Sequence, residues 1–124
     1  MSNLIERAKA HFSEQAVRHI DVPEWGSGGK PLRVHCRPLS IAARRKCWRN
    51  EAGETVDGTV ACVRAVLFQA LDAAGTRLFD DMDEKALMYD VDSDVVARIG
   101  AFILGFSAGK PKSAQEEVEA AKNG

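Results

Sequence analysis

Three cysteines and three histidines are the first side chains to test for a nucleophile, a general base or a zinc ligand. Ligands of a structural zinc ion usually come in pairs two to four residues apart, and no pair among His35, Cys36 and Cys47 has that separation. A cysteine beside a histidine could support nucleophilic catalysis, but nothing in the sequence orders these residues into a triad. We therefore expect no enzyme activity, no metal and no cofactor. The odd number of cysteines and their wide spacing indicate reduced, mostly buried thiols.

Two glycine-lysine stretches are candidates for a phosphate-binding loop. They are EWGSGGKP at residues 24–31 and GFSAGKP at residues 105–111. A Walker loop needs a glycine, four further residues, and then Gly-Lys-Ser/Thr. In the first stretch Glu24 stands at the position of the first glycine and Pro31 at that of the hydroxyl residue, and the second stretch fails in the same two ways. Both stretches therefore indicate turns and not nucleotide sites.

The stretch DVDSD at residues 90–94 copies the first five positions of a calcium-binding EF-hand loop. Such a loop needs glycine at its sixth position and a bidentate glutamate at its twelfth. This chain has Val95 and Ala101 there, so the ligand set cannot close. We expect these carboxylates to cap a helix.

The residues around the first glycine-rich stretch alternate between apolar and polar, which predicts a β-hairpin over residues 17–37. Apolar Ile20 and Val22 alternate with His19 and Asp21, and the same pattern recurs from residue 32 to residue 37. We expect a connecting loop longer than the two-residue minimum, in which three glycines supply positive φ: Gly26, Gly28 and Gly29. A hairpin alone is marginal in water, so its apolar face must pack on other elements.

Helical patterns fill most of the remaining chain. An amphipathic helix is predicted over residues 2–14, with Ser2 as its N-cap, and a second helix is predicted to begin after Ser40. Residues 59–73 are apolar nearly all round, which is typical of the central helix of a domain, and Gly75 is in the position that ends such a helix.

Two further helices are predicted towards the C-terminus. A capping box from Asp81 to Glu84 should begin a short helix through residues 86–89, and Asp92 or Ser93 should cap the last helix. The apolar face of the last helix is formed by six residues: Val95, Val96, Ile99, Phe102, Ile103 and Phe106.

The expected fold class is α+β and mostly α. It contains an N-terminal helix, a β-hairpin and a cluster of about four helices. Residues 1–109 are expected to form one globular domain. Residues 110–124 contain Val118 as their only large aliphatic side chain and are expected to form a flexible tail.

Composition narrows the classes of function. A formal net charge of −1 argues against a dedicated nucleic-acid binder, and no apolar run has the length of a membrane span. The first fifteen residues include acidic side chains and no continuous apolar core, so they do not form a secretory signal. The expected compartment is the cytoplasm.

Charge is segregated along the chain. Residues 30–49 carry seven lysines and arginines and no acid, whereas residues 72–94 carry eight acids and two basic side chains. Three interpretations stay open. The two segments neutralise each other or are simply solvated; they are separate patches that steer a protein partner; or the basic segment around Trp48 touches a phosphate backbone.

The two tryptophans, Trp25 and Trp48, have alternative roles. A tryptophan beside a hairpin turn most often packs on a neighbouring element, here the first helix. An exposed one would be an anchor for a partner, because tryptophan is enriched among interface hot spots.

The order of these elements resembles the tail assembly chaperones of long-tailed bacteriophages and prophages. Three stretches within residues 1–108 carry the resemblance: VPEWG at 22–26, RPLS at 37–40 and ALDAAGTRLFDD at 70–81. None is a catalytic signature, so the resemblance lies in their order and spacing. The insert at residues 27–30 is longer than the family pattern and should alter only the loop.

The resemblance implies a non-enzymatic protein of the host cytoplasm, which binds the tape measure protein while the tail tube protein polymerises around it. In such families a longer form made by ribosomal frameshifting often accompanies the short one, and residues 110–124 resemble the place where the two would diverge. The alternative is a structural tail component, a terminator or connector subunit that stays in the virion.

A chaperone for a long helical client needs an apolar patch rimmed by charge. The candidates are the hairpin tip, the face of the helix after Ser40, and the acidic connection before residue 82. Their partner-binding residues are Trp25; Ile41, Arg44, Arg45 and Trp48; and Phe79, Asp80 and Asp81.

Overall fold

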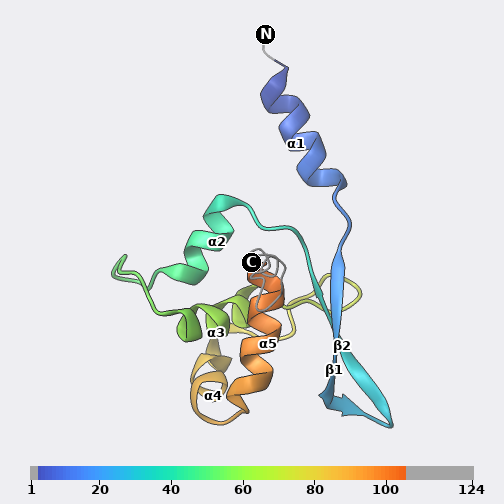
Figure 1. The fold of residues 1–124 in the computed structure, drawn as a ribbon, viewed down its shortest axis with the longest axis vertical. Helices are drawn as coiled ribbons and strands as arrows, with labels where there is room; N and C mark the ends of the chain where they lie inside the picture. Colours follow the sequence, from blue (N-terminus) through green and yellow to red (C-terminus); the bar gives the residue numbers. More distant parts are fainter. Residues whose placement is uncertain (1–2, 106–124) are drawn as a thin grey trace, which may run out of the picture.

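The computed structural model describes residues 3–105 and has the expected α+β fold. In this range, five α-helices and a 3₁₀ turn accompany one two-stranded antiparallel sheet (Figure 1). Ser2, Phe106 and the expected tail at residues 110–124 lie outside the described residues. The elements are α1 (Leu4–Glu14), β1 (Arg18–Ser27), β2 (Lys30–Cys36), α2 (Ile41–Trp48), α3 (Gly58–Gln69), η1 (Asp81–Asp83), α4 (Glu84–Tyr89) and α5 (Ser93–Leu104).

The hairpin has the predicted strands and the predicted buried face. Arg18 pairs with Cys36, and Val22 pairs with Leu32. The apolar side chains of the alternating pattern point into the molecule, and Val22, Val34 and Cys36 are fully buried. The period-two pattern therefore placed the strands and their inner face correctly.

The turn of the hairpin is shorter than expected. Ser27 pairs with Lys30, so Gly28 and Gly29 alone form the turn, with φ of 61° and 78°. Two consecutive positive φ values are the signature of a tight hairpin turn, which glycine adopts without strain. Gly26 does not have positive φ. It lies in a bulge, where four residues of β1, 23–26, oppose only Pro31 of β2.

The helix after Ser40 begins where it was predicted. The Ser40 hydroxyl accepts a hydrogen bond from the Ala43 amide at 3.1 Å and caps α2. Asp57 caps α3 in the same way, since its carboxylate accepts from the Val60 amide at 2.9 Å.

The prediction that the central helix continues to residue 73 and ends at Gly75 is wrong. α3 ends at Gln69, because Leu71 leaves the helix and exchanges two backbone hydrogen bonds with His35 of β2. Their N···O distances are 2.8 and 2.9 Å. Gly75, with φ of 89°, lies instead in a turn that the Asp72 carboxylate holds by accepting from the Ala74 and Thr76 amides.

The capping box before α4 lies one residue earlier than predicted. Asp80 caps η1, and the Asp83 carboxylate accepts from the Asp80 amide at 2.9 Å. Of the two candidates for the last helix, Asp92 is the N-cap, and its carboxylate accepts from the Asp94 amide. The carboxylates at residues 90–94 thus include a helix cap, as expected.

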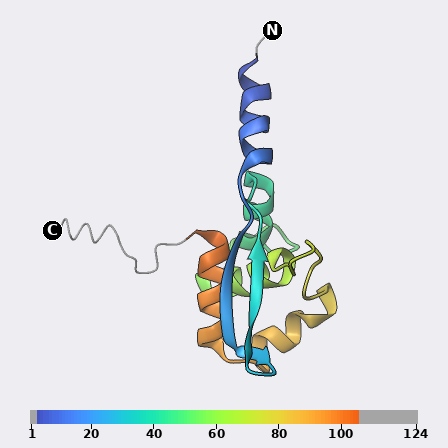
Figure 2. The ribbon, with the colours of Figure 1, turned by 90° about the vertical axis from the view of Figure 1, so that its right-hand side faces the viewer.

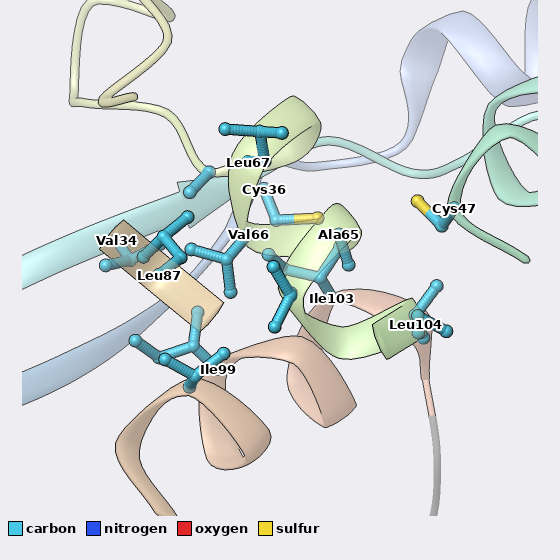
Figure 3. Packing of buried hydrophobic residues seen from close by; sticks show 14 of the residues in the cluster. Val34, Cys36, Cys47, Ala65, Val66, Leu67, Leu87, Ile99, Ile103 and Leu104 are labelled. Carbon is cyan, nitrogen blue, oxygen red and sulfur yellow. The ribbon is translucent and has the colours of Figure 1, made fainter. Parts of the chain in front are cut away.

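The core lies where α3, α5 and the inner face of the hairpin meet. α3 is buried over seven consecutive residues, and α5 contributes Val95, Val96, Ile99 and Ile103 to the same buried cluster. Figure 3 shows Ile99 and Ile103 beside α3. α2 and α4 close the other sides, each with one fully or largely buried side chain, Cys47 and Leu87. A helix that is apolar all round requires such neighbours on every side.

A glycine sets the distance between α3 and α5. A Cβ atom added to Gly100 would lie 2.4 Å from the Cβ atom and 2.6 Å from the Cα atom of Cys62. The overlap is with the Cα and Cβ atoms of Cys62, so a change of side-chain rotamer cannot relieve it. The two helices can therefore approach this closely only with glycine at position 100.

We therefore expect Gly100→Ala to destabilise the fold by about 2 kcal/mol, because the overlap outweighs the higher helix propensity of alanine. Chemical denaturation followed by circular dichroism measures the change. The matched control is Gly58→Ala, at the first residue of α3, where the nearest heavy atom is 3.9 Å away. That variant should change the free energy of unfolding by less than about 0.5 kcal/mol. Equal stability of the two variants would contradict the packing argument.

Candidate functional site

The three cysteine thiols are buried in the core and are free of disulfides. Burial raises the pKa of Cys36 and Cys62 above the ordinary value, and it raises the pKa of Cys47 to about 11. The Cys36 thiol donates to the Arg37 carbonyl oxygen at 3.1 Å. Since the thiolate is the reactive form, these cysteines are disfavoured as nucleophiles.

His35 is a strand residue whose backbone ties β2 to Leu71. Its ring lies 5.6 Å from that of His19, and its Nδ1 atom is buried without a hydrogen-bond partner. Among residues 3–105, no cluster of three or more His, Cys, Asp or Glu side chains could hold a metal ion.

A charged pocket of about 600 Å³ lies between α2, α3 and the η1–α4 segment. Arg64 of α3 is at its base and is only 5% exposed. Its Nε atom donates to the Lys46 carbonyl oxygen at 3.1 Å, and its Nη1 atom lies 3.5 Å from Glu84 and 3.8 Å from Glu51. The charge of this buried guanidinium is therefore compensated by carboxylates of the protein itself.

The two oppositely charged segments, residues 30–49 and 72–94, both contribute side chains to the charged pocket. Arg45 and Lys46 of α2 and Arg49, the residue after this helix, line it together with Asp81 and Glu84. The segments thus lie near each other, as the first of the three interpretations requires. The Asp81 carboxylate pairs with Arg77 at 2.9 Å, and Arg45 is exposed at the rim.

An apolar groove of about 370 Å³ lies beside the hairpin tip. The Trp25 ring meets the Phe79 ring edge to face, with centroids 6.0 Å apart. This pairing brings together two of the three predicted partner-binding regions, the hairpin tip and the acidic connection. Six residues line the groove: Trp25, Leu32, Leu78, Phe79, Leu87 and Val91.

The third predicted region, on α2, lies apart from the apolar groove and contributes no residue to it. Ile41 is 79% exposed, and Trp48 is half-buried against the core. Arg44 extends towards α5, where it donates to the Leu104 carbonyl oxygen. Of the predicted residues, Trp25 and Phe79 therefore share one surface, whereas Arg45 and Asp81 share the charged pocket.

Helix α1 is the surface that the sequence reasoning missed. Trp25 was predicted to pack on this helix, but α1 projects away from the body and none of its residues is buried (Figures 1 and 2). Ile5 is 60% and Phe12 is 39% exposed. The apolar spacing of the helix was visible in the sequence, but a sequence pattern cannot show whether the chain folds back to cover it.

In comparisons with known proteins, no family model, no curated protein and no solved structure matches this chain. In the part of the chain that the structure describes, no helix is long and apolar enough to cross a membrane.

Because the Cys47 thiol is buried, we expect the folded state to lose stability at alkaline pH. The unfolded thiols ionise near their ordinary pKa of 9.0, whereas Cys47 in the folded protein stays protonated to about pH 11. The unfolded state then binds fewer protons, so the free energy of unfolding should fall as the pH rises from about 9 towards 11. Urea denaturation across this range measures the fall, and Cys47→Ala should make it shallower than in the unmodified protein.

The same burial should protect the thiols from reagents. At pH 8 an aromatic disulfide reagent should modify the folded protein slowly and all three cysteines rapidly in denaturant. Rapid modification of the folded protein would contradict the placement of the thiols.

Proposed function

We propose that this protein is a non-enzymatic tail assembly chaperone of a long-tailed bacteriophage or prophage. It acts in the host cytoplasm and binds the tape measure protein during assembly of the tail tube. The proposal rests on the resemblance of the sequence to that family and on one structural observation, the apolar groove formed by Trp25 and Phe79.

The groove suits a helical client. Its lining is apolar, and acidic residues adjoin it in the chain, with Asp80 after Phe79 and Asp90 before Val91. An apolar core with a charged rim is the usual anatomy of a protein interface. The volume admits one or two apolar side chains, so the groove would hold part of an apolar helical stripe and keep it from aggregating.

The other surfaces support binding and not catalysis. The thiols are buried and hard to ionise, and the buried guanidinium in the charged pocket is compensated by Glu84 and Glu51. Two further partners are proposed from the family resemblance alone. They are the tail tube protein and a frameshifted longer form of this protein.

Co-expression with the candidate tape measure protein, the long helix-rich product of a neighbouring gene, tests the function. The client should become soluble only with this protein, and the two should elute together from a sizing column. Trp25→Ala and Val91→Asp should each weaken the complex roughly tenfold or more, because they remove an aromatic anchor or place a charge in the groove.

Two control variants locate the effect. Met82→Asp adds the same charge at a residue that is 88% exposed and does not line the groove, and it should bind like the unmodified protein. Ile41→Asp tests the face of α2 in the same way. Unchanged melting temperatures would separate lost binding from lost folding.

A client that is soluble alone and forms no complex would contradict the proposal. Presence of the protein in purified virions would favour the alternative, a terminator or connector subunit.

A further inference from the structure

Helix α1 presents an apolar face that the rest of the described chain does not cover. None of its 11 residues is buried, although Leu4, Ile5, Ala8 and Phe12 lie on one side of the helix at about 100° per residue. An isolated helix of this length is marginal in water. A surface that covers this face would therefore also stabilise the helix.

The connection to β1 prevents α1 from reaching the apolar groove of its own chain. Arg18 and Trp25 are seven residues apart on β1, which is about 23 Å in a fully extended strand and somewhat less across the bulge at residues 23–26. α1 is about 16 Å long, and residues 15–17 are needed to reverse the chain. A folded-back α1 would instead meet the outer face of the hairpin, where His19, Asp21 and Pro23 are exposed and mostly polar.

The charges around the two apolar surfaces are complementary. On α1, Lys9 and His11 flank the apolar face with Arg7 beyond them, whereas Glu6 and Glu14 lie towards the opposite side. Lys9 also pairs with Glu6 at 3.7 Å, but both side chains are exposed, so this ion pair is weak.

Around the groove, the exposed residues that adjoin its lining in the chain include the acids Asp80 and Asp90. The basic Arg33, next to Leu32, is paired with Asp21 at 2.9 Å, and the basic Arg77, next to Leu78, is paired with Asp81 at 2.9 Å. Glu24, next to Trp25, is paired with Arg98. An apolar helix with basic flanks thus matches an apolar groove with acidic neighbours.

We propose that the apolar groove binds helix α1 of a second copy of this chain. The hairpin tip and α4 lie at the end of the molecule opposite α1 (Figures 1 and 2). Two copies side by side in antiparallel orientation therefore place each α1 against the groove of the other, which closes a symmetric dimer. α1 of the partner copy occupies the groove in the way proposed above for a client helix. The contact itself requires no client and is tested without one.

Sedimentation velocity of the whole chain, from about 1 µM to about 1 mM, tests for the dimer. The unmodified protein should shift from monomer to dimer with concentration. The helix variant, Ile5→Asp with Phe12→Asp, and the groove variant, Val91→Asp with Trp25→Ala, should each weaken dimerisation at least tenfold. Ala10→Asp, on the polar side of α1, adds a charge to the same helix and should dimerise normally.

Mixing the two variants gives the decisive result. The helix variant keeps its groove and the groove variant keeps its helix, so the mixture should form a 1:1 heterodimer although neither variant dimerises alone. Melting temperatures of the separate variants check that both are folded, and the exposed single change Val91→Asp replaces the groove variant if it is not.

Four outcomes would overturn the proposal. One is an unmodified protein that stays monomeric throughout the concentration range. Another is a helix variant that still dimerises. The third is a mixture without heterodimer. The fourth is a groove variant that dimerises alone, which would assign the contact to α1 pairing with α1. Since no client is present, these outcomes leave the chaperone proposal to its own test.

Discussion

The close approach of α3 and α5 is the constraint on which the rest of the fold depends. Gly100 lets the backbone of α5 reach Cys62, so that Ile99 and Ile103 pack on a helix buried over seven consecutive residues. Apart from Arg64, the middle of α3 is apolar on every side, and it therefore needs α5, the hairpin, α2 and α4 around it. The hairpin gains its stability in turn from burying Val22 and Val34 against these helices, because two strands alone are marginal.

The backbone pairing between His35 and Leu71 links the packing of the core to the position of the apolar groove. Two backbone hydrogen bonds hold the chain after α3 along β2, and the same connection then delivers Phe79 to the edge of the Trp25 ring. The groove is thus a consequence of how α3 ends. A helix that continued to residue 73 would have removed the backbone pairing that places the connection beside the hairpin.

The charged pocket and the apolar surfaces differ in whether the protein itself supplies their binding partners. In the charged pocket, Arg64 has carboxylate neighbours and a carbonyl acceptor, so its buried charge is compensated within the molecule. The apolar groove and the apolar face of α1 have no such internal complement among the described residues. Exposed apolar area of this kind favours association, and both the client and the second copy that we propose would cover it.

The sequence by itself determined the local structure. Period-two alternation located the strands and their inner face, Ser40 located the start of α2, and the apolar spacing of residues 95–103 located the buried face of α5. These features depend on neighbours in the chain. Only the tertiary structure decided where α3 stops, because Leu71 pairs with a strand far away in sequence, and which candidates meet, because Trp25 and Phe79 are 54 residues apart. It also decided that the rest of the described chain leaves α1 uncovered, since whether an apolar face is buried depends on where the other elements lie.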